Sequence, residues 1–197
     1  MASLPVKTVS RTVAAFKNRL HQVVAPIIRK VAPNAKMRPH GMLPEAFAAY
    51  LATGYKMQRV GQTMTVPGHV VAASAGTHDQ DGVLGGIPYA VCVDFRVKDM
   101  TEMQVKTFLM SLWSSGFAAW YRCAKHPEDH WLGVTHVHAA WAAAPMKAPC
   151  RKQVHSFCHK PTLTGLKSDL EYHFAQPSDM QRQKIAIAFL AHNPAEG

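Results

Sequence analysis

The sequence lacks the motifs that mark several common classes of protein. No G-x-G-x-x-G follows a predicted strand and no Walker A motif occurs, so the usual dinucleotide and nucleoside-triphosphate loops are absent. No segment repeats along the chain, which argues against a solenoid or a propeller. The four cysteines form no C-x-x-C pair, which argues against a cysteine-based zinc knuckle. We expect most of them to be free, buried thiols: Cys92, Cys123, Cys150 and Cys158.

Long apolar runs are also missing. No stretch of about 18 apolar residues occurs, so we expect no helix that spans a membrane. Near the N-terminus, Arg11, Lys17 and Arg19 interrupt any apolar segment, so we expect no cleaved secretory signal. If the protein acts outside the cytoplasm, we therefore expect another route to deliver it.

Acidic residues are scarce relative to basic ones. The chain has 22 Lys and Arg against 12 Asp and Glu, a formal net charge of +10. Such a charge implies an anionic partner: nucleic acid, anionic lipid or the acidic polymers of a bacterial envelope. No ribonucleoprotein, zinc-finger or basic-zipper pattern is present, so nucleic acid is not expected. The apolar fraction of 48% is enough for a real core.

Residues 1–35 are predicted to contain a basic amphipathic helix, separate from a domain over 40–197. Apolar residues recur there at alternating steps of four and three, from Val9 to Ile27. Two interpretations remain open for this helix. It either docks on the domain with a solvated basic face, or binds an anionic envelope surface or a partner. A segment rich in Pro, Asn and Gly, residues 33–44, links it to the domain.

The domain is predicted to be α+β, a small antiparallel sheet with flanking helices. Thr101 and Gln104 form a capping box for a helix that ends at Gly116. Strands are expected over 89–97, 117–122 and 133–141, and other helices over 45–54 and 178–192. Residues 142–176 are predicted to be loop-rich, with a short helix near 153–158.

One group of residues has the composition of a zinc site. His78, Asp94 and His138 can supply three protein ligands and leave one position open for water. His136 and His138 alternate on one strand and therefore share a face of the sheet. If that strand lies beside the strand of Asp94, the zinc site forms on the sheet face. Against this, 12 histidines in 197 residues produce an H-x-H pattern by chance fairly often.

The same residues carry a resemblance to a family. A His, a later Asp and an H-x-H resemble the LAS group of zinc peptidases. That group includes lysostaphin-type endopeptidases, D-alanyl-D-alanine carboxypeptidases and penicillin-insensitive murein endopeptidases, and it shares its fold with the hedgehog signalling domain. The wider pattern resembles small phage and proteobacterial peptidoglycan peptidases, over five motifs: Gly76–His78, Pro88–Asp94, Gly116–Arg122, Asp129–Trp131 and His136–His138.

The resemblance implies roles for individual residues. It makes His78, Asp94 and His138 the Zn²⁺ ligands and leaves His136 unligated as a catalytic helper. This chain departs from the family in two ways. Asp94 follows His78 by 16 residues, a longer gap than is usual, so the insert must loop out and return. Thr135 also stands where many members have an acidic general base.

The general base must then be His136 or a residue of the preceding loop, Asp129 or His130. Those two could equally be ordinary solvated loop residues. Arg96 and Arg122 could hold a substrate carboxylate, although exposed arginines on strands are commoner. Tyr89 could stabilise an oxyanion.

These expectations combine into a zinc metallopeptidase that cuts an amide bond in the stem peptide or cross-link of peptidoglycan. We expect it to be a monomer that is made in the cytoplasm and acts in the periplasm or cell wall, as an endolysin or a secreted antibacterial toxin. Two alternatives remain. One is a non-enzymatic basic binding module and the other a virion structural protein, each with a structural or degenerate metal site.

Overall fold

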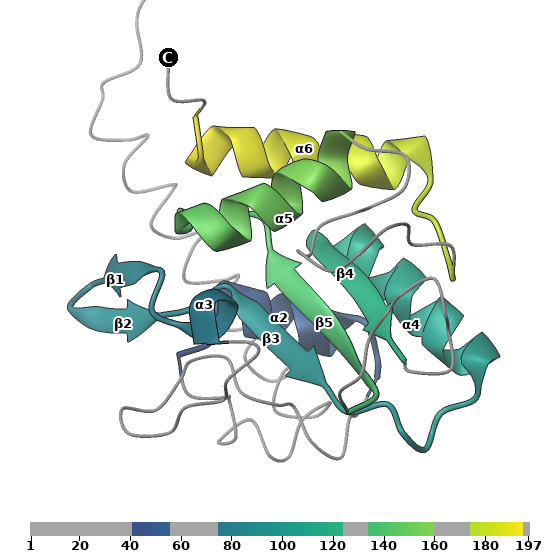
Figure 1. The fold of residues 1–197 in the computed structure, drawn as a ribbon. Helices are drawn as coiled ribbons and strands as arrows, with labels where there is room; N and C mark the ends of the chain where they lie inside the picture. The colour runs from purple at the N-terminus through teal and green to yellow at the C-terminus, as the bar shows by residue number, and fades with distance from the viewer. Residues whose placement is uncertain (1–40, 56–74, 124–133, 160–173, 195–197) are drawn as a thin grey trace, which may run out of the picture. The chain divides into compact units, whose positions relative to one another are not determined.

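The computed structural model describes residues 41–55, 75–123, 134–159 and 174–194 (Figure 1). The chain divides into two compact units, Met1–Met37 and Arg38–Gly197, and all described residues belong to the second. The helix predicted within residues 1–35 therefore lies outside the described residues. In the second unit, helices combine with a two-stranded and a three-stranded antiparallel sheet, which confirms the predicted α+β class.

The three-stranded sheet positions the predicted site. Its strands are β3 (Cys92–Phe95), β4 (Phe117–Arg122) and β5 (His136–Trp141), in the spatial order β3-β5-β4. The strand of the H-x-H motif thus lies beside the strand of Asp94, as the zinc hypothesis requires. Asp94 is directly opposite His138 in the register. Because side chains alternate along a strand, Asp94, His136 and His138 lie on one face.

The opposite face of the sheet is apolar and packs on two helices. The Phe95 ring lies 4.8 Å from Tyr50 of α2 (Pro44–Ala52) and 5.3 Å from Phe108 of α4 (Glu102–Ser115). Phe95 and Phe108 are fully buried, and each such side chain contributes about 1.5–3 kcal/mol. A slip of one residue in β3 would turn Phe95 outward, so this packing also holds Asp94 on the other face.

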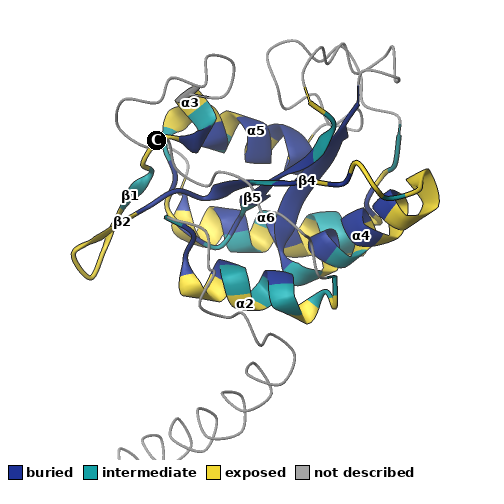
Figure 2. Cartoon of the chain, turned by 90° about the horizontal axis from the view of Figure 1, so that it is seen from below, coloured by how far each residue is buried: buried dark blue, intermediate teal, exposed yellow. Residues whose placement is uncertain are grey.

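The face that carries Asp94 is covered by α5 (Ala148–His159). The Phe157 ring of α5 meets Trp120 of β4 edge-on, with the ring centroids 5.4 Å apart. Helix α6 (Asp179–His192) packs against α5 and buries Ile185 and Phe189. Figure 2 shows the sheet between α5 and α2, with β4 buried along its whole length.

The predicted helix α4 is confirmed together with both of its ends. The Thr101 hydroxyl accepts from the Gln104 N–H, and the Gln104 side chain accepts from the Thr101 N–H. Gly116 ends the helix with φ 100°, a left-handed conformation that favours glycine. Ser178 and Gln181 form a second capping box at the start of α6. No described helix combines the length and the apolar character needed to cross a membrane.

Two sequence-based predictions were wrong in their extent. The single strand expected over 89–97 is interrupted, because Ala90 and Val91 have hydrogen-bond partners outside a regular ladder. The Ala90 N–H donates to the Gly41 carbonyl and the Val91 N–H donates to the Asp81 carboxylate. The loop-rich segment after 142 contains the full helix α5, twelve residues long, with Pro149 in its first turn.

The insert between His78 and Asp94 folds as a β-hairpin. Strands β1 (Gly82–Leu84) and β2 (Ile87–Tyr89) pair antiparallel. Gly85 and Gly86 connect them with φ 58° and 80°, the positive values that a two-residue hairpin turn requires. Before the hairpin, the short helix α3 (Ala75–His78) packs on β3 and on α5. Helix α3 thereby brings His78 to the face of the sheet that carries Asp94.

Candidate metal centre

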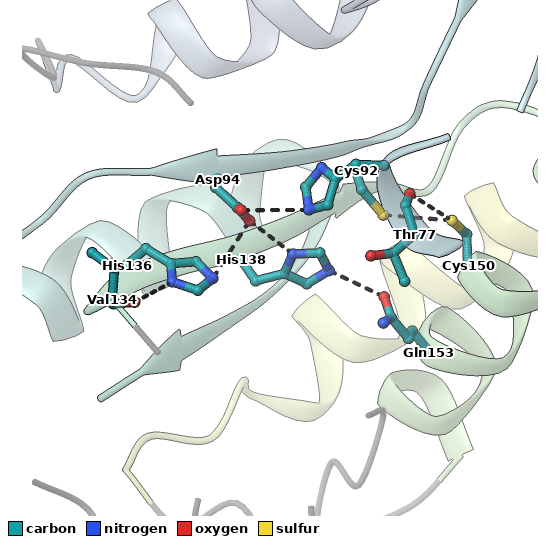
Figure 3. Close-up of polar contacts among 9 residues, drawn as sticks. Thr77, Cys92, Asp94, Val134, His136, His138, Cys150 and Gln153 are labelled. Atoms are coloured by element: carbon teal, nitrogen blue, oxygen red, sulfur yellow. Dashed lines mark hydrogen bonds and ion pairs between the residues drawn. The ribbon is translucent and has the colours of Figure 1, made fainter. Parts of the chain in front are cut away.

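Three predicted ligands meet in one cluster. One ligand atom each from His78, Asp94 and His138 lies within 4.8 Å of the others, and among the described residues this is the one group of three or more such side chains close enough to hold a metal ion. The His138 Nδ1 lies 2.9 Å from the Asp94 Oδ1 (Figure 3). The His78 Nε2 lies 3.4 Å from the Asp94 Oδ2. The structure therefore brings together all three residues that the motifs had indicated.

Because these side chains are buried, their polar contacts are energetically unfavourable unless a cation binds between them. The side chains of His78 and His138 are only 3% and 5% exposed. The Nδ1 of His78 is buried without a hydrogen-bond partner, and its buried Nε2 has only the long 3.4 Å contact with the Asp94 Oδ2. A buried polar nitrogen without a partner costs about 1–3 kcal/mol, and a metal ion at the Nε2 would remove much of that cost. The donor set of two imidazoles and one carboxylate suits a borderline-soft divalent ion.

His138 has a polar neighbour at each ring nitrogen. Its Nδ1 faces Asp94, and its Nε2 lies 3.1 Å from the Oε1 of Gln153 on α5. An amide oxygen only accepts, so in this orientation the Nε2 carries the proton. An ionised Asp94 also only accepts, so without a metal the 2.9 Å contact needs a proton on the Nδ1 as well, and a bound cation would take the place of that proton. Metal-binding histidines commonly have such a partner at the other nitrogen.

The electrostatics of Asp94 and His138 favour the charge states that bind metal. Burial acts to raise the pKa of Asp94, but hydrogen bonding and the charges of His138 and His78 outweigh it and hold that pKa well below its usual range. Burial lowers the pKa of His138, which the nearby Asp94 carboxylate only partly offsets. Both shifts favour the ionised carboxylate and the neutral imidazole, the protonation states that metal coordination requires.

His136 lies at the edge of the cluster, on its accessible side. Its Nδ1 lies 2.6 Å from the Val134 carbonyl, which only accepts, so this nitrogen carries the proton. Its Nε2, 3.5 Å from the Asp94 Oδ1, is then the basic nitrogen. The side chains of Asp94 and His136 are 27% and 13% exposed, in contrast to the buried His78 and His138. The cluster is thus accessible from the side on which His136 stands.

The other predicted site residues have different surroundings. Asp129 and His130 lie outside the described residues. Arg122 is fully buried, so the expectation of an ordinary exposed arginine is wrong for it. It stands opposite His136 in the register and on the same sheet face. Arg96 is exposed, just beyond the end of β3. The Tyr89 hydroxyl donates to the Pro145 carbonyl at 2.9 Å, and burial, with a smaller contribution from the Asp81 carboxylate, raises the Tyr89 pKa.

Two side chains that shape the centre were not predicted from the sequence. Gln153 contacts His138 from a helix that the sequence only partly revealed. Asp81 belongs to the insert, and its carboxylate accepts from the Val91 and Lys147 N–H groups at 2.7 Å and 3.0 Å. It ties the base of the hairpin to the residue before β3 and to the residue before α5. The signal available for Gln153 was its position, three residues after Cys150 on a helix face that also includes Phe157.

Comparisons with protein-family models, with curated proteins and with solved structures gave no match to this chain. The functional argument therefore depends on the geometry of the cluster itself. That geometry defines an α+β protein with a His-Asp-His group, His78, Asp94 and His138, that could hold a metal ion.

Proposed function

We propose that the protein is a zinc-dependent peptidase that hydrolyses an amide bond in the stem peptide or cross-link of peptidoglycan. The observation that carries the proposal is the cluster of His78, Asp94 and His138 with His136 at its accessible side. Three protein ligands with an accessible side are typical of catalytic zinc, whereas structural zinc is enclosed by four.

Each residue of the cluster would have its own role in such a site. His78, Asp94 and His138 would hold Zn²⁺, and Gln153 would orient the His138 ring through its Nε2–H. Zn²⁺ held by these three residues would supply a Lewis acid that can polarise a carbonyl and lower the pKa of a bound water. The His136 Nε2, basic when its Nδ1–H faces the Val134 carbonyl, would accept a proton and return it to the leaving amine. Asp129 and His130 remain alternative bases from the preceding loop.

Two properties support peptidoglycan as the substrate. The net charge of +10 favours adsorption to the anionic polymers and lipids of a bacterial envelope. The motifs from Gly76–His78 to His136–His138 resemble those of peptidases that act on the wall. We infer action in the periplasm or cell wall after release or delivery.

The burial of two ligands favours a second candidate. His78 and His138 are almost inaccessible, as the ligands of a structural metal are. In a basic binding module or a virion protein the ion would stabilise the fold, and a fourth protein ligand would complete it. Of the two candidate functions, the accessible side at His136 favours the catalytic one.

The decisive experiment is mass analysis of purified muropeptides of several cross-link types after incubation with the protein. Zinc-loaded wild type should cleave one of them, and the chelated protein and His138→Ala should not. His155→Ala is the matched control, because His155 is an exposed histidine on α5 outside the cluster. If zinc-loaded wild type cleaves none of the muropeptides, the peptidase proposal is wrong. Independently of cleavage, if His138→Ala binds as much zinc as the wild type, the assigned ligand set is wrong.

A further inference from the structure

Two cysteines lie side by side next to the metal cluster. Cys92 on β3 and Cys150 on α5 are 58 residues apart in the chain, yet their Sγ atoms are 3.5 Å apart (Figure 3). Both residues are fully buried. Cys92 shares the sheet face of Asp94, two residues away, and Cys150 shares a helix face with Gln153, three residues away. The thiol pair therefore joins the strand and the helix that support His138 from its two sides.

The two sulfurs are in non-bonded contact, and a disulfide requires them to move closer together. A disulfide has an S–S length of about 2.0 Å, so the two sulfurs need to approach by about 1.5 Å from their 3.5 Å contact. The other two cysteines have different surroundings. Cys123 receives a contact from the Thr135 hydroxyl at 3.8 Å, and Cys158 lies near Arg182. Among the described residues, Cys92 and Cys150 are the cysteines with sulfurs already in contact.

The Cys150 thiol also contacts α3. It donates to the Thr77 carbonyl at 3.3 Å, and Thr77 precedes the ligand His78. Strand β3, helix α3 and helix α5 thus meet at this one sulfur pair. We propose that Cys92 and Cys150 form a disulfide when the chain folds in an oxidising environment, and that this bond fastens α5 to β3 beside the metal cluster. The proposal does not depend on the peptidase activity.

The bond forms by exchange with a small-molecule disulfide, RSSR. The thiolate of one cysteine attacks RSSR to give a mixed disulfide and releases one RS⁻. The thiolate of the other cysteine attacks the protein sulfur of that mixed disulfide and releases a second RS⁻. In total, two cysteine thiols are oxidised to one disulfide, one RSSR is reduced to two RSH, and protons balance. Because both sulfurs are fully buried in the folded chain, the exchange precedes the docking of α5 on β3 or occurs when α5 opens.

The test is refolding of the full chain from denaturant in a buffer of oxidised and reduced glutathione with a chelator. A parallel sample refolds in reductant alone. Intact mass should show the loss of two hydrogens in the oxidised sample. Mapping without reduction should link the Cys92 peptide to the Cys150 peptide and leave Cys123 and Cys158 open to alkylation. The proposal is overturned if Cys92 and Cys150 both alkylate, or if either pairs with another cysteine.

Variants test whether the bond fastens the fold. The double variant Cys123→Ser, Cys158→Ser should keep the bridge, and its oxidised form should melt roughly 5–10 °C above its reduced form. Cys92→Ala should show no difference between the two buffers. A bridged double variant that melts at the same temperature in both states contradicts the fastening role. If a variant does not fold, the peptide map of the wild type still decides the pairing. Neither readout uses metal or substrate, so a failure here is distinct from a failure of the peptidase proposal.

Discussion

Replacing Gln153 with methionine should weaken zinc binding about 10- to 100-fold. The change keeps the length of the side chain and removes the amide that lies 3.1 Å from the His138 Nε2. The imidazole is then left with a buried N–H that water cannot reach, because His138 is only 4% exposed. An unsatisfied buried donor costs about 1–3 kcal/mol, and about 1.4 kcal/mol corresponds to tenfold in affinity. Losses of 10- to 100-fold are also typical when a partner of a metal ligand is removed.

The measurement is competition for Zn²⁺ between the protein and a chromophoric chelator at pH 7.5. The shift in thermal midpoint on adding zinc provides a second readout, since a ligand that binds only the folded state stabilises it by an amount that grows with the logarithm of the ratio of free ligand to Kd. Gln153→Glu should restore affinity to within a few-fold of wild type, because a carboxylate also accepts from the Nε2–H. Gln183→Met makes the same change at an exposed position on α6 and serves as the control.

Two outcomes would refute the reasoning about Gln153. One is a folded Gln153→Met that binds zinc as tightly as wild type. The other is a loss of stability in Gln153→Met that is equally large with and without zinc and that Gln153→Glu does not repair, since this would indicate a packing role alone. In either case His138 does not depend on the amide for its orientation.

Two further predictions concern the pH dependence and the backbone. The Asp94 pKa is depressed in the folded state, so its contribution to stability is present above the unfolded pKa of about 3.9 and is lost as the pH falls through the folded value. The stability difference between chelated wild type and Asp94→Asn should therefore be present at pH 6 and shrink below about pH 4 in denaturant titrations; a difference that does not change between these pH values contradicts the assignment. Gly116→Ala should destabilise by about 1–2 kcal/mol in the same assay, because it places a Cβ at φ 100° and 3.4 Å from the Trp141 ring. Gly76→Ala, with no atom within 4 Å of its added Cβ, should be nearly neutral.

Local signals in the sequence were sufficient for the elements that they control. The Thr101–Gln104 box and Gly116 mark both ends of α4 because capping depends on neighbouring residues only. Period-two alternation placed His136 and His138 on one face for the same reason. The zinc hypothesis had to assume that Asp94 lies on the strand next to that of His138. The sequence could not establish this, because the order β3-β5-β4 depends on packing between segments far apart in the chain.

Gln153 shows why the remainder of the site was not predicted. The apolar face of α5 consists of Cys150, Val154 and Phe157, and Gln153 lies within it. The sequence predicted only a short helix near 153–158 within a loop-rich segment, and a buried glutamine does not fit the hydrophobic pattern that identifies a helix face. The glutamine is satisfied because His138 is its partner, and that partner comes from a different element. A polar residue on a buried face is informative only once the other side of the contact is known.

The gap of 16 residues between His78 and Asp94 was the weakest feature of the zinc hypothesis, and the hairpin explains how the site tolerates it. Doubling the length of a loop costs only about 0.6 kcal/mol in closure entropy. Asp81 offsets this cost, because its carboxylate accepts from the Val91 and Lys147 N–H groups and each such bond contributes about 1 kcal/mol. The two ends of the insert are therefore held together at the base of the hairpin. His78 and Asp94 are therefore close in space although they are far apart in the sequence.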